Sequence, residues 1–430
     1  MSHQPRDPIV ASVRWYAESV LEWVERNGWA GWDPYDLWDN AFGQWAMERR
    51  TVAQRLLGGI VSRAEELAPI AVRRAMRVRR HVNPKSIGLL AASFVRLAHL
   101  GEASAIVDEE PRYVRFFRWL DEHRVPCGEG FGWGYPFDWR TRVLIPRGTP
   151  TVVTSAVIGD AYWQRYRLLG DVGALRSCEA VCRFVLTGLN RSSTGREGTF
   201  CFSYTPLDHF EVHNANLLGA EFVVRVGQEL DRREWVELGL AAARFSVDDR
   251  LPDGTLSYWS TRQQGAQAQQ DTYHSGFEIR ALDGIARATG SAEFRRAAND
   301  YFATWRRDFF GPDGAPGFVR GRFDVVEIHS CAEALLCAAA MRESGVLTAQ
   351  ELARHVSAVL EATARALWRE VGPGVGYFAW ARRQRYGFSF TTDIPMMHWG
   401  QAWMAAALTA SLAALQPSAP AGGREKGDRA

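Results

Sequence analysis

A unit of roughly 55–70 residues recurs along this chain of 430 residues and constrains its fold more than any other feature. Each unit opens with an aromatic cluster, continues through a polar loop and a helix rich in small residues, and ends with a more amphipathic helix. The clusters occupy 131–135, 202–204, 254–259, 314–318 and 376–380. The helices after them start near Thr154, His213, His274, His329 and His398, and 84–88 opens a sixth. Because stacked helical pairs bury a continuous core, the units predict a closed ring.

Apolar residues recur with helical spacing through most of the sequence, and strand-like alternation is rare. The predicted helices cover 8–26, 52–82, 85–100, 112–123, 152–169, 172–189, 214–230, 233–247, 275–289, 292–310, 330–344, 349–371 and 399–415. The small-residue helices suit an inner ring and the others an outer ring, which predicts an all-α fold, an (α/α)6 toroid with short aromatic-rich loops or hairpins where the inner helices start. We expect 1–83 to complete the toroid, 84–415 to form the repeat core, and 416–430 to be disordered.

Composition narrows the classes of partner and compartment. The net charge of +2 gives no reason to expect nucleic acid or an anionic membrane as a partner. No apolar run approaches the roughly 20 residues of a membrane span, and the N-terminus lacks the features of a signal peptide. The six cysteines lack paired spacing, so we expect reduced thiols in a cytoplasmic protein. Lysine occurs only at Lys85 and Lys426, so any cationic role in a site is expected to fall to arginine.

Four histidines stand at equivalent helix openings, each within five positions after an acidic residue: His213, His274, His329 and His398. Acidic side chains at these places are expected to cap helix N-termini. Since all inner helices start at one end of a toroid, the histidines and aromatic clusters are predicted to surround one funnel. Imidazole suits proton transfer near neutral pH, whereas a capping or core role is the structural alternative. The spacing does not match a helical zinc motif, so we predict no metal and no cofactor.

The aromatic clusters and the arginines near them predict a carbohydrate site, because sugars stack on aromatic rings and guanidinium groups bind carboxylates. Packing of the funnel rim is the alternative. Tyr258, Arg262 and His274 suit proton abstraction beside a carboxylate, with Arg262 neutralising it and Tyr258 and His274 moving protons; a structural loop is the alternative. The predicted substrate-binding residues are Trp133, Tyr135, Asp138, Arg142, Tyr204, Glu211, His213, Asn214, Trp259, Asp271, His329 and His398.

Paired carboxylates are a different catalytic device that the sequence leaves open. Two of Asp138, Glu211, Asp271 and Glu327 could form the opposed pair of a glycosidase, which requires a separation of about 5–9.5 Å. Helix capping explains the same acidic residues. Two other toroid chemistries find no support, because the chain lacks the Asp-x-Asp-Asp acid of squalene-type cyclases and the zinc motifs of lanthionine-cyclase-like proteins.

A set of short segments resembles a bacterial and archaeal toroid family that is found among capsule, exopolysaccharide and glycan-assembly genes. The segments are 31–36 (GWDPYD), 131–135 (FGWGY), 150–155 (PTVVTS), 201–206 (CFSYTP), 212–220 (VHNANLLGA) and 271–277 (DTYHSGF). Members of this family are commonly labelled as prenyltransferase/squalene-oxidase-repeat-like or aminolevulinate-dehydratase-like proteins. The resemblance covers roughly residues 30–410 and implies a toroid in polysaccharide biosynthesis, without implying a particular reaction.

A second resemblance concerns the chemistry. Segments 258–262 (YWSTR) and 271–275 (DTYHS) are similar in order to closing motifs in the C-terminal toroid of heparan-type glucuronyl C5-epimerases. The spacing from tyrosine to arginine is one residue longer here, Thr272 is an extra residue, and the acid–tyrosine pair of those enzymes has no clear counterpart. The resemblance therefore extends to Tyr258, Arg262 and His274 as catalytic residues.

The leading hypothesis is a cytoplasmic carbohydrate-active protein of polysaccharide biosynthesis. It would act by proton abstraction, as a uronate epimerase or lyase, on an acidic oligo- or polysaccharide that is either free or lipid-linked. Glycosyltransferases are candidate partners. The alternatives are a glycoside hydrolase with paired carboxylates and a non-catalytic glycan-binding or scaffold protein.

Overall fold

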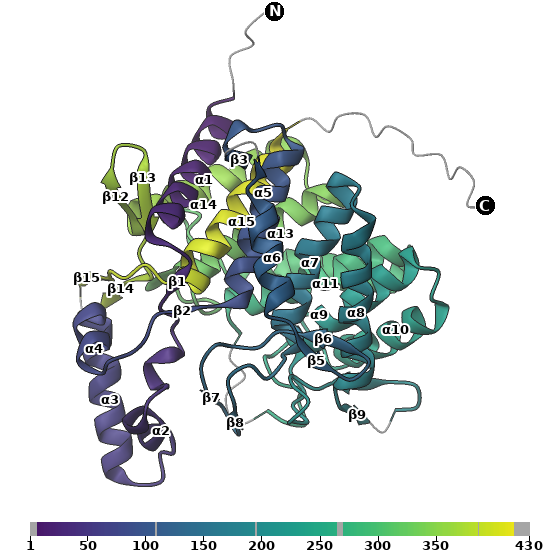
Figure 1. Ribbon diagram of the computed structural model, residues 1–430, viewed down its shortest axis with the longest axis horizontal. Helices are drawn as coiled ribbons and strands as arrows, with labels where there is room; N and C mark the ends of the chain where they lie inside the picture. The colour runs from purple at the N-terminus through teal and green to yellow at the C-terminus, as the bar shows by residue number, and fades with distance from the viewer. Residues whose placement is uncertain (1–6, 108–109, 194–195, 265–269, 386, 417–430) are drawn as a thin grey trace, which may run out of the picture.

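The computed structural model describes residues 7–107, 110–193, 196–264, 270–385 and 387–416. Residues 417–430, the greater part of the predicted disordered tail, lie outside the described residues. Within the described part, helices dominate, and the strands are short and connect them (Figure 1).

Six of the described helices form a closed inner ring. They are α5 (Pro84–His99), α7 (Val152–Leu169), α9 (His213–Glu229), α11 (Thr272–Thr289), α13 (Ile328–Glu343) and α15 (Trp403–Leu415). Each packs against the next, and α15 packs against α5, so the ring closes. Small residues allow the close approach: an added Cβ atom on Gly88 would lie 2.8 Å from Ile158, and one on Gly159 would lie 2.5 Å from Phe222. A π-helical turn, η3 (Met397–Ala402), leads into α15.

An outer helix covers each inner one. The outer helices are α6 (Tyr113–Glu122), α8 (Val172–Gly188), α10 (Arg233–Asp248), α12 (Ala292–Asp308), α14 (Ala349–Leu367) and α1 (Pro8–Asn27). The first five pack on the inner helix that precedes them, and α1 packs on α15, the last inner helix. The predicted all-α (α/α)6 toroid is therefore confirmed.

Side-chain caps fix where the inner helices begin. Thr151, Asp271 and Glu327 accept hydrogen bonds from backbone N–H groups in the first turns of α7, α11 and α13, and Asn83 does the same for α5. Such caps satisfy donors that the helix itself leaves free. The predicted capping role is therefore confirmed for Asp271 and Glu327. It is wrong for Glu211 and Asp393, because α9 and η3 begin without a side-chain cap and these two carboxylates accept hydrogen bonds from other side chains.

Short antiparallel strand pairs lie in the connections, and all but the first are hairpins. They pair β1 (Ala30–Gly31) with β2 (His81–Val82), β3 (Ile106–Val107) with β4 (Glu110–Pro111), β5 (Val125–Cys127) with β6 (Gly130–Gly132), β7 (Trp139–Arg140) with β8 (Leu144–Ile145), β9 (Arg191–Ser193) with β10 (Phe200–Phe202), and β12 (Trp368–Gly372) with β13 (Val375–Phe378). A three-stranded sheet has the order β11 (Val325–Glu327), β14 (Ala381–Arg385), β15 (Phe388–Thr392). The predicted helix 349–371 therefore ends earlier, at Leu367, because β12 follows it directly.

Residues 36–75 form an N-terminal helical unit that projects from the ring at the lower left of Figure 1. The unit contains η1 (Asp36–Trp38), α2 (Ala41–Met47), α3 (Val52–Leu67) and α4 (Pro69–Ala75). Outside the unit, the short turn η2 (Ala103–Ala105) follows α5. The prediction of one helix over 52–82 is wrong: Pro69 cannot continue the α3 hydrogen-bond ladder and starts α4 instead. Among the described helices, none combines the length and apolar character that crossing a membrane requires.

Candidate active site

A cavity of about 450 Å³ lies among the first turns of the inner helices, and most of its wall is aromatic. The aromatic lining residues are Tyr35, Tyr135, Trp139, Tyr204, Tyr258, Trp259, Tyr273, Phe277, Phe318, Trp399 and Trp403. The polar lining residues are Lys85, Asn214, Ser257, Gln264, Asp271, His274 and His329. A cavity of this size with an apolar wall and a few polar groups has the character of a small-molecule site.

His274 and Asp271 form a hydrogen-bonded pair at the start of α11. The Nδ1 atom of His274 lies 2.7 Å from the Oδ2 atom of Asp271, whose Oδ1 atom accepts the backbone N–H of His274 at 2.8 Å. When the imidazole is neutral, a carboxylate beside Nδ1 favours the tautomer that carries its proton there. The Nε2 atom of a ring that lines the cavity is then a proton acceptor, which is the arrangement of a general base.

Two tyrosine rings flank this imidazole. The ring centroid of Tyr258 lies 4.6 Å from that of His274, and the centroid of Tyr273 lies 4.2 Å from it. Burial, and then the neighbouring Tyr204, raises the pKa of Tyr258 well above its ordinary value. Burial, and then the nearby carboxylate of Asp271, does the same to the pKa of Tyr273. Both phenols therefore keep their protons at neutral pH and can donate hydrogen bonds or a proton.

His329 presents an uncharged ring to the cavity. It stacks 4.6 Å from Tyr273 on one side and 4.7 Å from Trp403 on the other, measured between ring centroids. Burial, and then the charge of His398, lowers the pKa of His329 well below its ordinary value. Neither ring nitrogen has a hydrogen-bond partner among the described residues, and the same holds for the Oδ1 atom of Asn214. Buried polar atoms without partners at a cavity wall are suited to bind a ligand.

Lys85 places an amine in the same wall. Its side chain is buried, and its Nζ atom donates a hydrogen bond of 3.3 Å to the hydroxyl of Tyr135. Burial lowers the pKa of Lys85 to about 8, against the opposing effect of the Asp33 carboxylate. The cation in the described wall is therefore this lysine, where the sequence led us to expect an arginine. The scarcity of lysine in the sequence was the signal that could have identified it.

Eight residues that the sequence predicted for the site do line the cavity: Tyr135, Tyr204, Asn214, Tyr258, Trp259, Asp271, His274 and His329. They come from four different connections and helix openings, so the expectation of convergence at one end of the ring holds for them. Seven other predicted residues are absent from the wall, for reasons that the contacts make clear.

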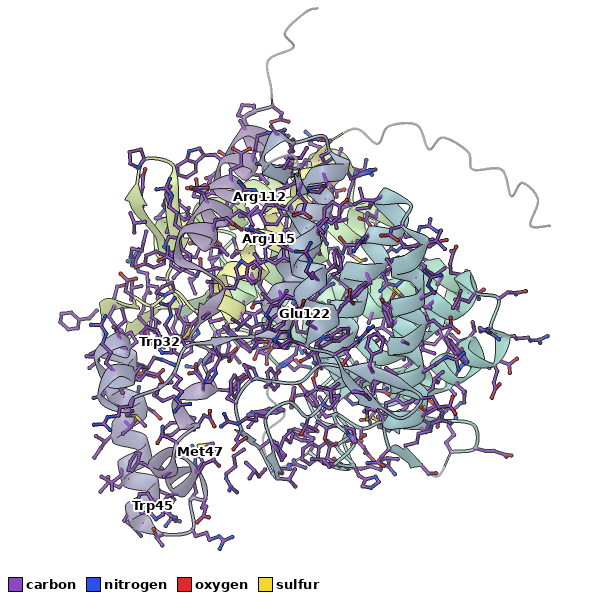
Figure 2. All side chains as sticks on the ribbon, in the orientation of Figure 1. Trp32, Trp45, Met47, Arg112, Arg115 and Glu122 are labelled. Atoms are coloured by element: carbon purple, nitrogen blue, oxygen red, sulfur yellow. The ribbon has the colours of Figure 1, made fainter. Side chains whose placement is uncertain are left out.

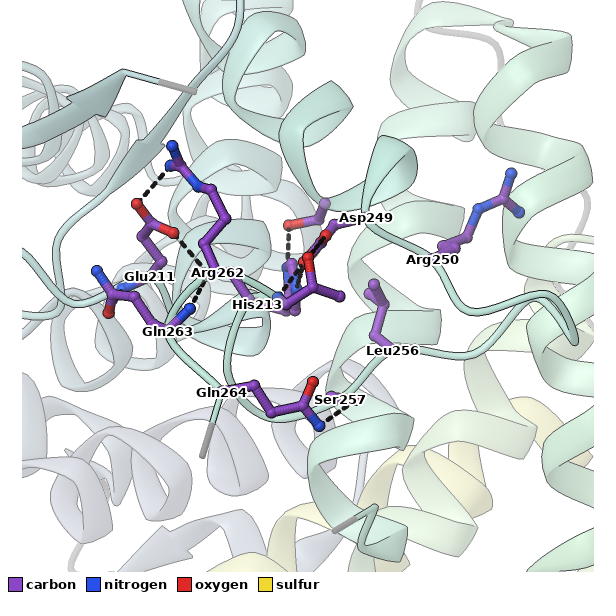
Figure 3. Close-up of polar contacts among 12 residues, drawn as sticks. Glu211, His213, Asp249, Arg250, Leu256, Ser257, Arg262, Gln263 and Gln264 are labelled. Atoms are coloured by element: carbon purple, nitrogen blue, oxygen red, sulfur yellow. Dashed lines mark hydrogen bonds and ion pairs between the residues drawn. The ribbon is translucent and has the colours of Figure 1, made fainter. Parts of the chain in front are cut away.

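Arg262 is held outside the cavity by an acid (Figure 3). Its Nη2 atom donates to the Oε1 atom of Glu211 at 2.5 Å, and its Nη1 atom donates to the backbone carbonyl of Ser193 at 3.2 Å. The other carboxylate oxygen of Glu211 accepts from Ser260 at 2.5 Å. Arg262 and Glu211 thus hold two loops together, and neither is among the described residues that line the cavity.

His213 and His398 are core residues rather than parts of the wall. His213 is buried between Ser246, 3.0 Å from its Nδ1 atom, and Asp249, 2.9 Å from its Nε2 atom (Figure 3). His398 is buried with its Nδ1 atom 2.6 Å from Asp33. The prediction that all four histidines face one funnel is therefore corrected to two.

Trp133, Asp138 and Arg142 also lie outside the wall. The ring of Trp133 is fully buried, and its Nε1 atom donates to the carbonyl of Leu120, so it packs the core. The Oδ1 atom of Asp138 accepts the backbone N–H of Arg147 at 2.8 Å. Arg142 lies over the ring of Trp259, 3.8 Å from its centroid, and so covers a residue of the wall from outside.

Several wall residues were missed by sequence reasoning. Tyr35 lies in the 31–36 segment, Tyr273 lies inside 271–277, and Trp399 follows His398 directly. Trp139 and Trp403 had no signal apart from aromatic character. The first three stand in motifs already singled out, where a neighbouring residue was chosen instead.

The described wall contains a single carboxylate, that of Asp271. Glu327 is buried, where its Oε1 atom accepts from the Trp399 indole at 2.7 Å and its Oε2 atom from the Ser330 backbone at 2.9 Å. Burial raises the pKa of Glu327 to about 7. No two of the four candidate carboxylates face each other across the cavity. In the described part of the chain, no three His, Cys, Asp or Glu side chains are grouped closely enough to hold a metal ion.

No family model matches the sequence, and no curated protein matches it. Solved structures do resemble the fold. A GH76 α-mannanase of Bacteroides thetaiotaomicron aligns with a TM-score of 0.55 and 11% identity over 88% of this chain and 98% of its own. A cellobiose 2-epimerase of Bacillus thermoamylovorans aligns with a TM-score of 0.54 and 11% identity, over 78% of this chain and 89% of its own. An unsaturated glucuronyl hydrolase specific for heparin gives 0.50 and 13%, over 78% and 87%. At these identities the likeness establishes the toroid fold alone.

Proposed function

We propose that the protein is a carbohydrate-active enzyme that removes the proton next to the carboxylate of a uronate residue, as an epimerase or a lyase. The observation that carries the proposal is the Asp271–His274 pair, in which a carboxylate orients the imidazole of a residue that lines a cavity with aromatic walls. A base held in one tautomer by a carboxylate can accept a proton from carbon once a substrate lies against it.

The aromatic wall supports a sugar as the ligand. The C–H faces of sugar rings pack on the faces of tyrosine and tryptophan, and hydroxyl groups need polar partners at the edges. The unpartnered atoms of His329 and Asn214 could supply such partners. The solved structures of the same fold include proteins named as a mannanase, a cellobiose epimerase and a glucuronyl hydrolase, which is consistent with a carbohydrate substrate.

Lys85 supports an acidic sugar. In this scheme its ammonium group binds the uronate carboxylate, the role that the sequence assigned to Arg262, and neutralises the negative charge that develops when the neighbouring carbon loses its proton. The hydroxyl of Tyr135, 3.3 Å from the Nζ atom, is placed to share that carboxylate. His274 accepts the proton, and the phenol of Tyr258 donates one.

Epimerase and lyase differ in the fate of the intermediate. Return of a proton to the opposite face of the carbon inverts it, whereas departure of the neighbouring glycosidic oxygen leaves an unsaturated sugar. The paired-carboxylate hydrolase has less support, because Asp271 is the one carboxylate in the described wall and it already holds His274.

The test is incubation of the protein with uronate-containing oligosaccharides in D₂O, followed by mass spectrometry for deuterium and absorbance for an unsaturated product. We expect wild type and R262Q to exchange the proton or to form the unsaturated product, and H274Q to do neither. Release of reducing ends with neither exchange nor an unsaturated product would assign the site to a hydrolase. Saturable binding without any reaction would assign it to a glycan-binding protein.

The wider context stays a prediction. A role in polysaccharide biosynthesis, a free or lipid-linked acidic glycan, glycosyltransferase partners and a cytoplasmic location all come from the sequence, and they await identification of the substrate.

A further inference from the structure

Helix α3 exposes an apolar stripe to solvent. Val52, Leu56, Ile60 and Leu67 are 71%, 62%, 54% and 72% exposed. At 3.6 residues per turn, these positions fall on one side of the helix. The opposite side is polar and buried, with Gln54 and Glu65 packed inward. An ordinary surface helix has the reverse arrangement, so the apolar stripe of α3 lacks a partner within the described chain.

Specific polar contacts fix this orientation. The side chain of Gln54 donates to the carbonyl of Trp45 at 2.9 Å and accepts the backbone N–H of Thr51 at 2.8 Å. Glu65 accepts from the buried Arg73 at 2.6 Å, and Arg73 also pairs with Asp36. Rotation of α3 to bury its leucines would break these bonds and leave buried charges unpaired. The packing of the unit therefore fixes the orientation in which the apolar stripe is exposed.

The segment that carries the stripe has an excess of positive charge. Residues 36–80, the unit with the turn that follows it, contain nine arginines against two aspartates and three glutamates, a net charge of +4, although the whole chain carries only +2. Arg49, Arg50, Arg55, Arg74 and Arg79 are exposed. The net charge of the whole chain gave no reason to expect an anionic membrane as a partner, but this one segment is cationic.

Helix α2, which packs on the Gln54 side of α3, adds two exposed aromatic side chains to the unit. Phe42 and Trp45 are exposed, and their ring centroids lie 5.7 Å apart. Trp45 and Met47 lie at the outer end of the projecting unit in Figure 2. We define the docking face as the exposed apolar residues of α2 and α3 with the exposed arginines of 49–79.

The docking face belongs to a unit that adjoins the cavity. Arg140 donates to the side chain of Gln44 in α2 at 3.0 Å, and the backbone N–H of Asp138 donates to Asp39 at 3.1 Å. Trp139, which lies between Asp138 and Arg140 in the sequence, lines the cavity. The unit therefore contacts the β7–β8 hairpin at the wall of the candidate active site.

We infer that the docking face binds the surface of an anionic lipid bilayer. Exposed leucine, isoleucine, phenylalanine and tryptophan with flanking arginines are the composition of helices that lie in a membrane interface, where the apolar groups enter and the cations meet lipid phosphates. A second copy of the chain is a poor occupant, because two faces of the same positive charge repel each other. This inference goes beyond the proposed reaction and does not depend on it; its consequence is that the cavity would stand beside the membrane.

The test is co-sedimentation of the full chain with two kinds of vesicle, phosphatidylcholine alone and phosphatidylcholine with phosphatidylglycerol. We expect binding to the anionic vesicles that weakens as salt is raised, and little binding to the neutral ones. L56S/I60S and R50Q/R74Q should each weaken binding by about tenfold or more, from lost apolar burial and lost phosphate attraction respectively.

Matched controls are V172S/V371S, which removes exposed apolar residues elsewhere, and R233Q/R244Q, which removes exposed arginines of α10. Both should bind like wild type, and circular dichroism should show the same helix content for every variant. Failure to bind anionic vesicles overturns the inference, as does equal weakening by the controls. Self-association that L56S/I60S abolishes, in the absence of vesicle binding, would assign the face to a second copy instead.

Discussion

The Nδ1 atom of His274 lies 2.7 Å from the Oδ2 atom of Asp271, and the same carboxylate caps the helix that carries the histidine. Asp271→Asn separates these two roles. Asparagine caps helices about as well as aspartate, so the thermal midpoint should stay within a few degrees. The loss of charge beside the imidazole should lower kcat by about 10²–10⁴ with a smaller change in KM. Steady-state kinetics of proton exchange measure both, and an unchanged kcat would contradict the assignment of His274 as the base.

Lys85 should destabilise the protein while it serves the site. Its pKa is about 8 in the folded chain against an ordinary 10.5, so between these values the unfolded chain binds the extra proton and stability rises with pH. Below pH 8 the folded chain bears the whole cost of the buried charge, on the order of 3 kcal/mol. Lys85→Met should therefore raise the free energy of unfolding at pH 7 and flatten its rise between pH 8 and pH 10.5. Urea unfolding at several pH values measures this.

The same lysine should determine the pH above which activity falls. A uronate carboxylate needs the ammonium form, so kcat/KM should fall as the pH rises through about 8. Lys85→Met should raise KM for uronate substrates by about tenfold or more and remove that limb of the profile. Retention of the alkaline limb in the variant would show that another group titrates there.

His329→Phe tests the meaning of two unpartnered nitrogens. Phenylalanine can keep the stacking between Tyr273 and Trp403 and removes buried polar atoms that have no partner in the described chain. Stability should be unchanged or higher by about 1 kcal/mol. Substrate affinity should fall by about tenfold, since a hydrogen bond to the sugar is lost. Thermal unfolding and KM separate the effects, and lower stability with normal KM would mark His329 as purely structural.

Arg262→Gln is expected to leave the chemistry intact. The guanidinium is bound to Glu211 and stands outside the cavity, so kcat/KM should stay within about twofold, the scale of a change with no direct contact. Loss of the ion pair should lower stability, because it leaves the buried carboxylate of Glu211 without its arginine. A loss of activity comparable to that of His274→Gln would restore Arg262 to the catalytic group.

Much of the fold followed from local signals. The small-residue helices, their acidic or hydroxyl caps and the spacing of the units predicted which segments pair and at which end they start, because capping and helical periodicity act within a few residues. The pair of Asp271 and His274 is equally local: three positions apart in one first turn, the carboxylate reaches both the backbone N–H and the ring.

The identity of the wall residues depended on the rotation of each helix. The side chains of adjacent positions on a helix point in directions about 100° apart. A side chain that lines the cavity can therefore be followed by one that is buried in the core. In α9 the histidine at position 213 turns toward Ser246 and Asp249, and Asn214 lines the cavity. Neither residue type nor spacing distinguishes these neighbours; the packing of α10 does.

Contacts between distant segments decided the rest. The sequence alone determined a closed ring of helical pairs with capped openings and an oriented histidine, because those features arise from interactions over a few residues. Only the tertiary structure bound Arg262 to Glu211, buried Lys85 beside Tyr135 and left the leucines of α3 outside. Each of these outcomes depends on which charges and apolar surfaces meet across the fold, and partners that lie 50 residues or more apart in the chain leave no mark on the local pattern.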